Sequence, residues 1–480
     1  MSSCRIWPAS WLVSPARRGE LVGFASKSIN ACRRIATHSV VRYGAASVFP
    51  RTVAVFGMFV ITPLGLSQLG VKSFAYWLLA TYVSGLVVSP DLGIGNSIVN
   101  EFGSDHARGI GLKKHEDRIR GLIKLLSIIA LTWLLVGIAT AYVYSMTSGQ
   151  RQDSTTVFVA LVLGLFCFLS AVPASVVQRI QLSQEKASQA LIWEGVGKTV
   201  GLGLSLVVLV WVPNLFLLIV AYMLPVSFFS WLNAFFFLKS HDIARVGRMP
   251  SIAHAVSENR HTFSVGKWFV VMQVCYLFTS ALDPYLINSF ASPSALVYFN
   301  VVRRPFDLLP IIVSTYALAL WPVFRRLRTH ANTVRLHRLF LSVTLVSVGL
   351  VVLGSVVIIL VRGPMYNYLS GGSVVPDLLD LLYFLLLMAS TASVLISTNY
   401  LNAVDQIRSQ TGVFVFGAIL MITAKIVSLI IGTVHLFVMV SAVSYFLFVA
   451  LPLLLLCIPT DHKARMFGGA KRGAAAPFEE

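Results

Sequence analysis

Six basic residues interrupt long apolar runs of this 480-residue chain: Arg51, Lys198, Lys267, Arg303, Arg304 and Lys425. A cation at the bilayer centre costs roughly 2.5–3.5 kcal/mol even on the lenient insertion scale, so six of them cannot all face lipid. We therefore expect these side chains to line a hydrated cavity. Their sign predicts an anionic substrate, because the planar fork of arginine and the point charge of lysine both suit phosphate.

Several of these cations have a possible partner on their own helix. Glu194 and Lys198 are spaced i,i+4, so they could neutralise each other instead of lining a cavity. Arg303 and Arg304 can both reach Asp307 along one helix, which would leave one of the two free.

The remaining cations differ in their expected roles. Lys267 lies close to a predicted membrane boundary and is expected to snorkel to it. Arg51 and Lys425 have no obvious partner on their own helix. They are therefore the leading candidates for the cavity, together with Lys198 and one of Arg303 or Arg304.

Four acidic residues in the same runs are candidates for coupling or gating: Asp91, Glu194, Asp283 and Asp307. A carboxyl in an apolar setting can hold a proton, so Asp91, Glu194 or Asp283 could couple transport to a gradient. Asp91 follows Pro90 and could instead cap a broken helix.

The composition is that of a polytopic membrane protein. Apolar residues make up 56% of the chain, charged residues only 12%, and the mean hydropathy is +0.79. The net charge of +19 does not indicate nucleic acid, because a nucleic-acid-binding module concentrates its charge on a soluble face. The five cysteines form no CxxC pair and the histidines no HExxH motif, so we expect neither a metal site nor a cofactor.

About twelve apolar windows are long enough to cross a bilayer, in two groups of six. The first group includes the predicted spans 44–66, 74–97 and 156–178. The predicted fold is therefore an all-α integral membrane protein with two six-helix lobes around a central cavity. Its parts are an N-terminal tail (1–43), an N-terminal lobe (44–238), a linker (239–263), a C-terminal lobe (264–458) and a C-terminal tail (459–480). The two groups repeat a small-residue turn followed by an aromatic pair, Tyr76-Trp77 and Tyr298-Phe299, which favours duplicated halves.

Positive charge is concentrated in alternate loops. One side carries residues such as Lys113, Lys114, Arg245, Arg328 and Arg335, whereas the opposite loops offer only Lys72, Arg151 and Arg362. This asymmetry predicts that both termini are cytoplasmic and that anionic phospholipids are partners of the basic side.

Two stretches of the chain resemble a known transporter family. The run LGVKSFAYWLLATYVSGLVVSPDLGIGNSIVNEFG, residues 69–103 with Asp91-Leu92-Gly93, resembles the first loop and second helix of the Wzx-type polysaccharide (O-antigen) flippases. These flippases form a branch of the multidrug/oligosaccharidyl-lipid/polysaccharide exporter superfamily. The segment from SALDPYLINSF, which contains Asp283, to ALALWPVFRRL is also similar, and the resemblance covers roughly residues 43–458.

The resemblance implies a flippase of the bacterial inner membrane that moves a polyprenyl-pyrophosphate-linked oligosaccharide to the periplasmic leaflet for polysaccharide export. A polysaccharide polymerase and the export machinery are further candidate partners. In the predicted mechanism Arg51, Lys425 and one of Arg303 or Arg304 hold the pyrophosphate while the lobes rock between inward-open and outward-open states, with no covalent step and so no enzymatic activity.

Two alternatives remain open on the sequence. A cation-coupled multidrug exporter of the same superfamily would share the twelve helices, but its cavity should be dominated by acids. A membrane-embedded glycan polymerase or transferase would display catalytic residues on a sizeable outer loop. The longest outer loop predicted, residues 362–376, lacks a convincing set.

Overall fold

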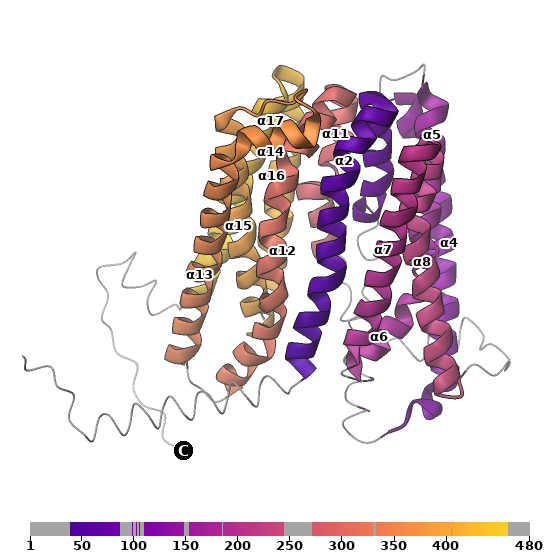
Figure 1. Ribbon diagram of the computed structural model, residues 1–480. Coiled ribbons are helices and arrows are strands. Elements are labelled where there is room, and N and C mark those ends of the chain that lie inside the picture. Colours follow the sequence, from indigo (N-terminus) through magenta and orange to yellow (C-terminus); the bar gives the residue numbers. More distant parts are fainter. Residues whose placement is uncertain are drawn as a thin grey trace, which may run out of the picture.

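The computed structural model describes residues 39–86, 98, 102, 105, 110–147, 153–184, 186–243, 271–329, 333–404 and 406–458. Every regular element in these ranges is a helix (Figure 1). Eight of the described helices are long and apolar enough to cross a membrane. The predicted all-α integral membrane fold is therefore confirmed.

The first half of the chain begins with a long helix that reverses direction. Helix α2 runs from Ser39 to Leu86 and contains a kink at Gly70, where φ is 75° and ψ is 165°. Only glycine adopts this conformation readily, so Gly70 allows a sharp turn between two helical limbs. These limbs correspond to the predicted spans 44–66 and 74–97, the second of which is described as far as Leu86. The helices that follow are α4 (Glu116–Thr147), α5 (Ser154–Leu169), α6 (Ser175–Ser183), α7 (Ala187–Trp211) and α8 (Leu215–Ser240).

The second half contains two π-helical segments. One of them, η3 (Leu277–Ala281), precedes α11 (Asp283–Phe290), and the other, η4 (Phe446–Ala450), joins α17 (Val434–Tyr445) to α18 (Leu451–Cys457). Between α11 and α17 lie α12 (Pro293–Thr329), α13 (Thr333–Leu360), α14 (Arg362–Ser370), α15 (Leu378–Ala403) and α16 (Ile407–Ile431). Short π-helical segments within α-helices are frequent at functional sites.

Two expectations about individual elements were wrong. The predicted span 156–178 is broken at residues 170–174 into α5 and α6, because Pro173 lacks the N–H that would continue the helix. The predicted outer loop 362–376 contains α14, which ends at Gly371 in the left-handed conformation that favours glycine at a helix C-terminus.

The helices form two groups that meet along α2 and α12. In Figure 1, α4 to α8 lie on one side, α12 to α17 lie on the other, and α2 stands between them in contact with α12. Helices α11, α14 and α17 lie at the top of this view, which we call the α14 end, and α6 lies towards the opposite, α6 end. The lobe boundaries and the cytoplasmic location of the termini stay predictions, and almost all of the linker and the two tails lies outside the described residues.

Helices α5 and α2 approach closely at Gly164. A Cβ atom at this position would lie 2.6 Å from the carbonyl oxygen of Ala80, which belongs to the backbone and cannot move aside. We expect Gly164→Ala to destabilise the protein by about 1–3 kcal/mol, measured as thermal unfolding in detergent. Gly203→Ala on α7 is the matched control, because its Cβ would meet nothing within 4 Å and alanine favours a helix. Equal melting of the two variants would contradict the close approach.

Candidate functional site

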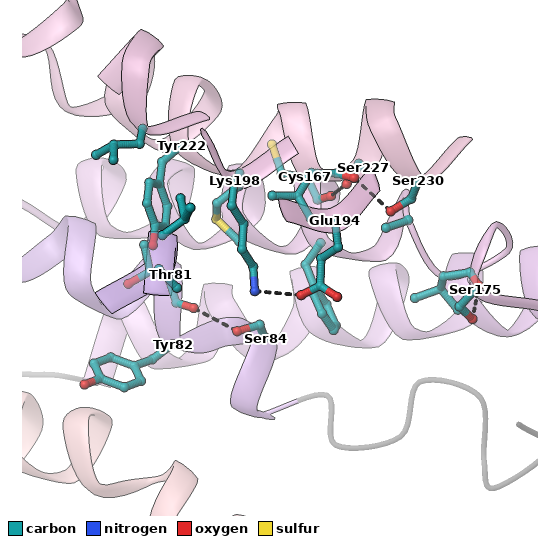
Figure 2. A pocket seen from close by; sticks show the side chains of 18 of the residues that line it. Thr81, Tyr82, Ser84, Cys167, Ser175, Glu194, Lys198, Tyr222, Ser227 and Ser230 are labelled. Carbon is teal, nitrogen blue, oxygen red and sulfur yellow. Dashed lines mark hydrogen bonds and ion pairs between the residues drawn. The ribbon is translucent and has the colours of Figure 1, made fainter. Parts of the chain in front are cut away.

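A cavity of about 590 Å³ lies among the helices of the first half (Figure 2), and Arg304 of α12 also lines it. Its volume falls within the range of roughly 300–1,000 Å³ that is usual for small-molecule sites. Polar side chains from α2, α6, α7, α8 and α12 contribute to the wall: Thr81, Tyr82, Ser84, Ser175, Gln178, Glu194, Lys198, Tyr222, Ser227, Ser230 and Arg304. The cavity therefore presents hydroxyl groups and three charges to its contents.

Glu194 and Lys198 both pair with each other and line the cavity. They lie one turn apart on α7, and Lys198 Nζ donates to Glu194 Oε1 at 2.6 Å. Neither side chain is sealed, since 29% of Lys198 and 34% of Glu194 remains exposed. Figure 2 shows the pair facing the same space as Thr81 and Ser84 of α2. The two roles that the sequence presented as alternatives thus coexist.

Arg303 and Arg304 occupy different environments. Consecutive residues of an α-helix point about 100° apart, so the two side chains leave α12 in different directions. Arg304 lines the cavity, with its guanidinium 5.9 Å from the ring centroid of Tyr82. Arg303 instead donates from Nε to Asp307 Oδ1 at 3.0 Å, and its Nη1 lies 4.0 Å from Asp283 Oδ2. The structure places Arg304 in the cavity and Arg303 in a network of carboxylates.

Lys425 is sealed inside the second half, and the expectation that it lines the cavity is wrong. Its Nζ donates to Asp283 Oδ1 and to the carbonyl oxygen of Thr279, in each case at 2.6 Å. Both charged side chains are buried, with 1% of Lys425 and 4% of Asp283 exposed. The sequence suggested a free cation because the partner lies on α11, whereas Lys425 lies on α16. A buried cation of this kind is neutralised in place by the carboxylate.

Arg51 joins the two halves. It is not one of the described residues that line this cavity. Its Nη1 donates to Ser314 Oγ at 3.0 Å and lies 3.4 Å from the carbonyl oxygen of Ile311, both on α12. Arg51 therefore ties the first limb of α2 to α12. Asp91 and Lys267, also predicted from the sequence, lie outside the described residues.

A second set of contacts between the halves was missed by sequence reasoning. Tyr285 of α11 donates its hydroxyl to the carbonyl oxygen of Leu79 at 2.7 Å. Asn288 Nδ2, one turn further on, donates to the hydroxyl of Tyr144 on α4 at 3.0 Å. The rings of Tyr144 and Tyr285 also meet edge to face, with centroids 5.6 Å apart. We call these contacts the α11 latch; the only signal in the sequence was a few polar residues within apolar runs.

Comparison with known proteins identifies the fold. No family model and no curated protein sequence matches the chain. Among solved structures it is similar to a multidrug resistance MATE family transporter of the MOP superfamily, in an inward-facing conformation. The TM-score is 0.65 at 12% identity, over 86% of this chain and 97% of that one. The chain has the fold of a MOP-superfamily transporter.

Other proteins with the MOP fold are similar to a comparable degree. The lipid II flippase MurJ, in an inward closed conformation, matches with a TM-score of 0.61 at 13% identity, over 87% of each chain. A MOP-superfamily transporter from Pyrococcus furiosus, described as having a binding pocket of reverse polarity, matches with a TM-score of 0.53 at 14% identity, over 88% of this chain and 96% of that one. The likeness to all three is one of fold.

The MOP fold of this chain repeats a polar contact in its two halves. Tyr76, the tyrosine of the first aromatic pair, donates to Asp153 Oδ2 at 3.1 Å, and Tyr298 of the second pair donates to Asp380 Oδ2 at 2.6 Å. Each acid also has a basic partner. Lys72 pairs with Asp153 and lowers the pKa of that carboxyl, and His435 Nδ1 lies 2.6 Å from Asp380 Oδ2. Sequence reasoning found the aromatic pairs but not these acids, which lie about 80 residues later.

Proposed function

We propose that the protein is a flippase that moves a polyprenyl-pyrophosphate-linked oligosaccharide across the bacterial inner membrane for polysaccharide export. It works by alternating access, without a covalent step. The transporter fold supports movement of a substrate over catalysis, and the lipid II flippase MurJ shows that this fold can serve a lipid-linked substrate. A membrane-embedded polymerase or transferase is correspondingly disfavoured.

The observation that carries the proposal is the charge of the cavity. Its wall holds two cations, Lys198 and Arg304, against one acid, Glu194, which is already paired with Lys198. Arg304 faces the ring of Tyr82 and has no carboxylate partner among the described residues. A net positive cavity attracts an anion and repels a cationic drug. The charge therefore favours a phosphate-bearing substrate over the substrates of a cation-coupled multidrug exporter.

The uncharged part of the wall suits a glycan. Ser175, Gln178 and Ser230 present hydroxyl and amide groups to the cavity, and Tyr222 adds an aromatic surface. Hydroxyl and amide groups can both donate and accept hydrogen bonds, as sugar hydroxyls do. The polar wall and Arg304 together match a headgroup that combines sugars with phosphate.

Replacing Arg304 tests the proposal. With undecaprenyl pyrophosphate as the probe in detergent micelles, we expect Arg304→Gln to weaken binding roughly 10- to 100-fold, because a charge-assisted hydrogen bond to phosphate is lost. Arg304→Lys should retain part of the affinity, since it keeps the charge but not the fork. Arg362→Gln on α14 removes an exposed arginine and is the matched control.

Two outcomes would overturn the flippase proposal. One is unchanged binding of undecaprenyl pyrophosphate by Arg304→Gln. The other is a wild-type protein that binds the cationic dye ethidium but no pyrophosphate lipid, which would favour the multidrug exporter. Transport itself can be followed with a fluorescent polyprenyl-pyrophosphate glycan in proteoliposomes, where arrival in the opposite leaflet makes the probe resistant to a membrane-impermeant quencher.

A further inference from the structure

We propose that Glu194 is a built-in substitute for the substrate's phosphate. It holds Lys198 while the cavity is empty and releases it when a multiply charged anion enters. The inference rests on the proposed function in that the substrate is taken to be anionic, and it adds a second cation and a selecting acid to the site.

The geometry of the pair makes such an exchange feasible. Both side chains line the cavity, and about a third of each remains exposed, in contrast to the sealed pair of Lys425 and Asp283. A solvent-accessible pair on one helix is held weakly, because water and mobile ions screen its attraction. An incoming phosphate can therefore compete for Lys198 without having to open a buried core.

The position of the pair means that release of Lys198 would provide a second cation for the ligand. Lys198 on α7 and Arg304 on α12 line the same cavity, and these helices belong to different groups of the bundle. A pyrophosphate offers several charged oxygens, so it can bind both cations at once. With Lys198 still held by Glu194, only Arg304 would be ready for an anion.

The same arrangement selects among ligands. A neutral sugar or a cation gains nothing from Lys198 and leaves the pair intact. A singly charged anion satisfies Arg304 alone, whereas a pyrophosphate or phosphate ester carries enough charge to displace Glu194. Glu194 is thus a specificity-determining residue for phosphate-bearing ligands.

A double-mutant cycle tests this role. With inorganic pyrophosphate and undecaprenyl pyrophosphate as separate probes, Glu194→Gln should tighten binding roughly two- to fivefold, because it frees Lys198 at little change in shape. Lys198→Gln should weaken binding more in the Glu194→Gln background than in the wild type. Asp377→Asn, at the N-terminus of α15, is the matched control: it removes the same charge elsewhere and keeps a side chain that caps a helix.

The outcomes separate this inference from the flippase proposal. Weaker or unchanged pyrophosphate binding by both Glu194→Gln and a second variant, Glu194→Ala, would overturn the role of Glu194. So would an equal gain from Asp377→Asn, or an effect of Lys198→Gln that is the same in both backgrounds. If inorganic pyrophosphate gives the expected cycle while the lipid probe does not bind, the role of Glu194 stands and the flippase proposal falls.

Discussion

Lys425→Met should yield a protein that is less stable than the wild type by about 3–5 kcal/mol, because breaking a buried ion pair leaves one charge without compensation. Among the described residues, the carboxylate of Asp283 would then keep one cation within 4.0 Å, the guanidinium of Arg303. Thermal unfolding in detergent, read by size-exclusion chromatography, measures the effect. We thus expect Lys425 to stabilise the fold instead of holding the pyrophosphate.

Removing both charges should recover most of the stability that Lys425→Met loses. The double variant Asp283→Leu with Lys425→Met replaces the pair by apolar groups of similar volume, a change that is often neutral or stabilising. Lys239→Met, on the exposed end of α8, is the control for loss of a lysine as such. If Lys425→Met is as stable as the wild type, or if the double variant is less stable than Lys425→Met, the pair does not stabilise the second half in this way.

Weakening the α11 latch should open the protein at its α14 end. Tyr285→Phe and Asn288→Ala together remove two hydrogen bonds between the halves, each worth roughly 0.5–1.5 kcal/mol, so the balance of closed and open states should shift about tenfold. Spin labels at Met146 on α4 and Phe290 on α11, both about half exposed, would report the change by double electron–electron resonance. We expect a new population at longer distance.

A surface tyrosine provides the control for this experiment. Tyr368→Phe on α14 removes a hydroxyl from an exposed side chain at the same end of the bundle. Its distance distribution should match that of the wild type. If the double variant also keeps the wild-type distribution, the contacts of α11 do not hold the halves together, and another element must close this end.

Apolar run lengths and small-residue segments predicted the parts of the fold that depend on residues close together in the sequence. The length of an apolar run decides whether a helix can cross a bilayer, so the membrane class followed from hydropathy alone. The turn at Gly70 was expected from the small-residue segment between the first two spans. The sequence predicted a single span through residues 170–174, because the run stays apolar and membrane helices often tolerate a proline such as Pro173.

For the charged residues, the sequence predicted the ion pairs within one helix but not the contacts between helices. A spacing of four residues was enough to suggest the pairs of Glu194 with Lys198 and of Arg303 with Asp307, both of which the structure contains. The partner of Lys425 lies 142 residues away, and the partners of Arg51 on α12 more than 250 residues away. Such contacts follow from how the helices assemble, which no spacing along one helix reveals.

The two neighbouring arginines of α12 give that helix a place in both charge systems. Arg304 reaches the cavity of the first half, and Arg303 reaches the carboxylates of the second. Because the two side chains are neighbours on α12, a turn of this part of the helix about its axis would displace Arg304 and Arg303 together. We therefore expect that binding of an anion in the cavity of the first half changes the contacts between Arg303 and Asp283 in the second half.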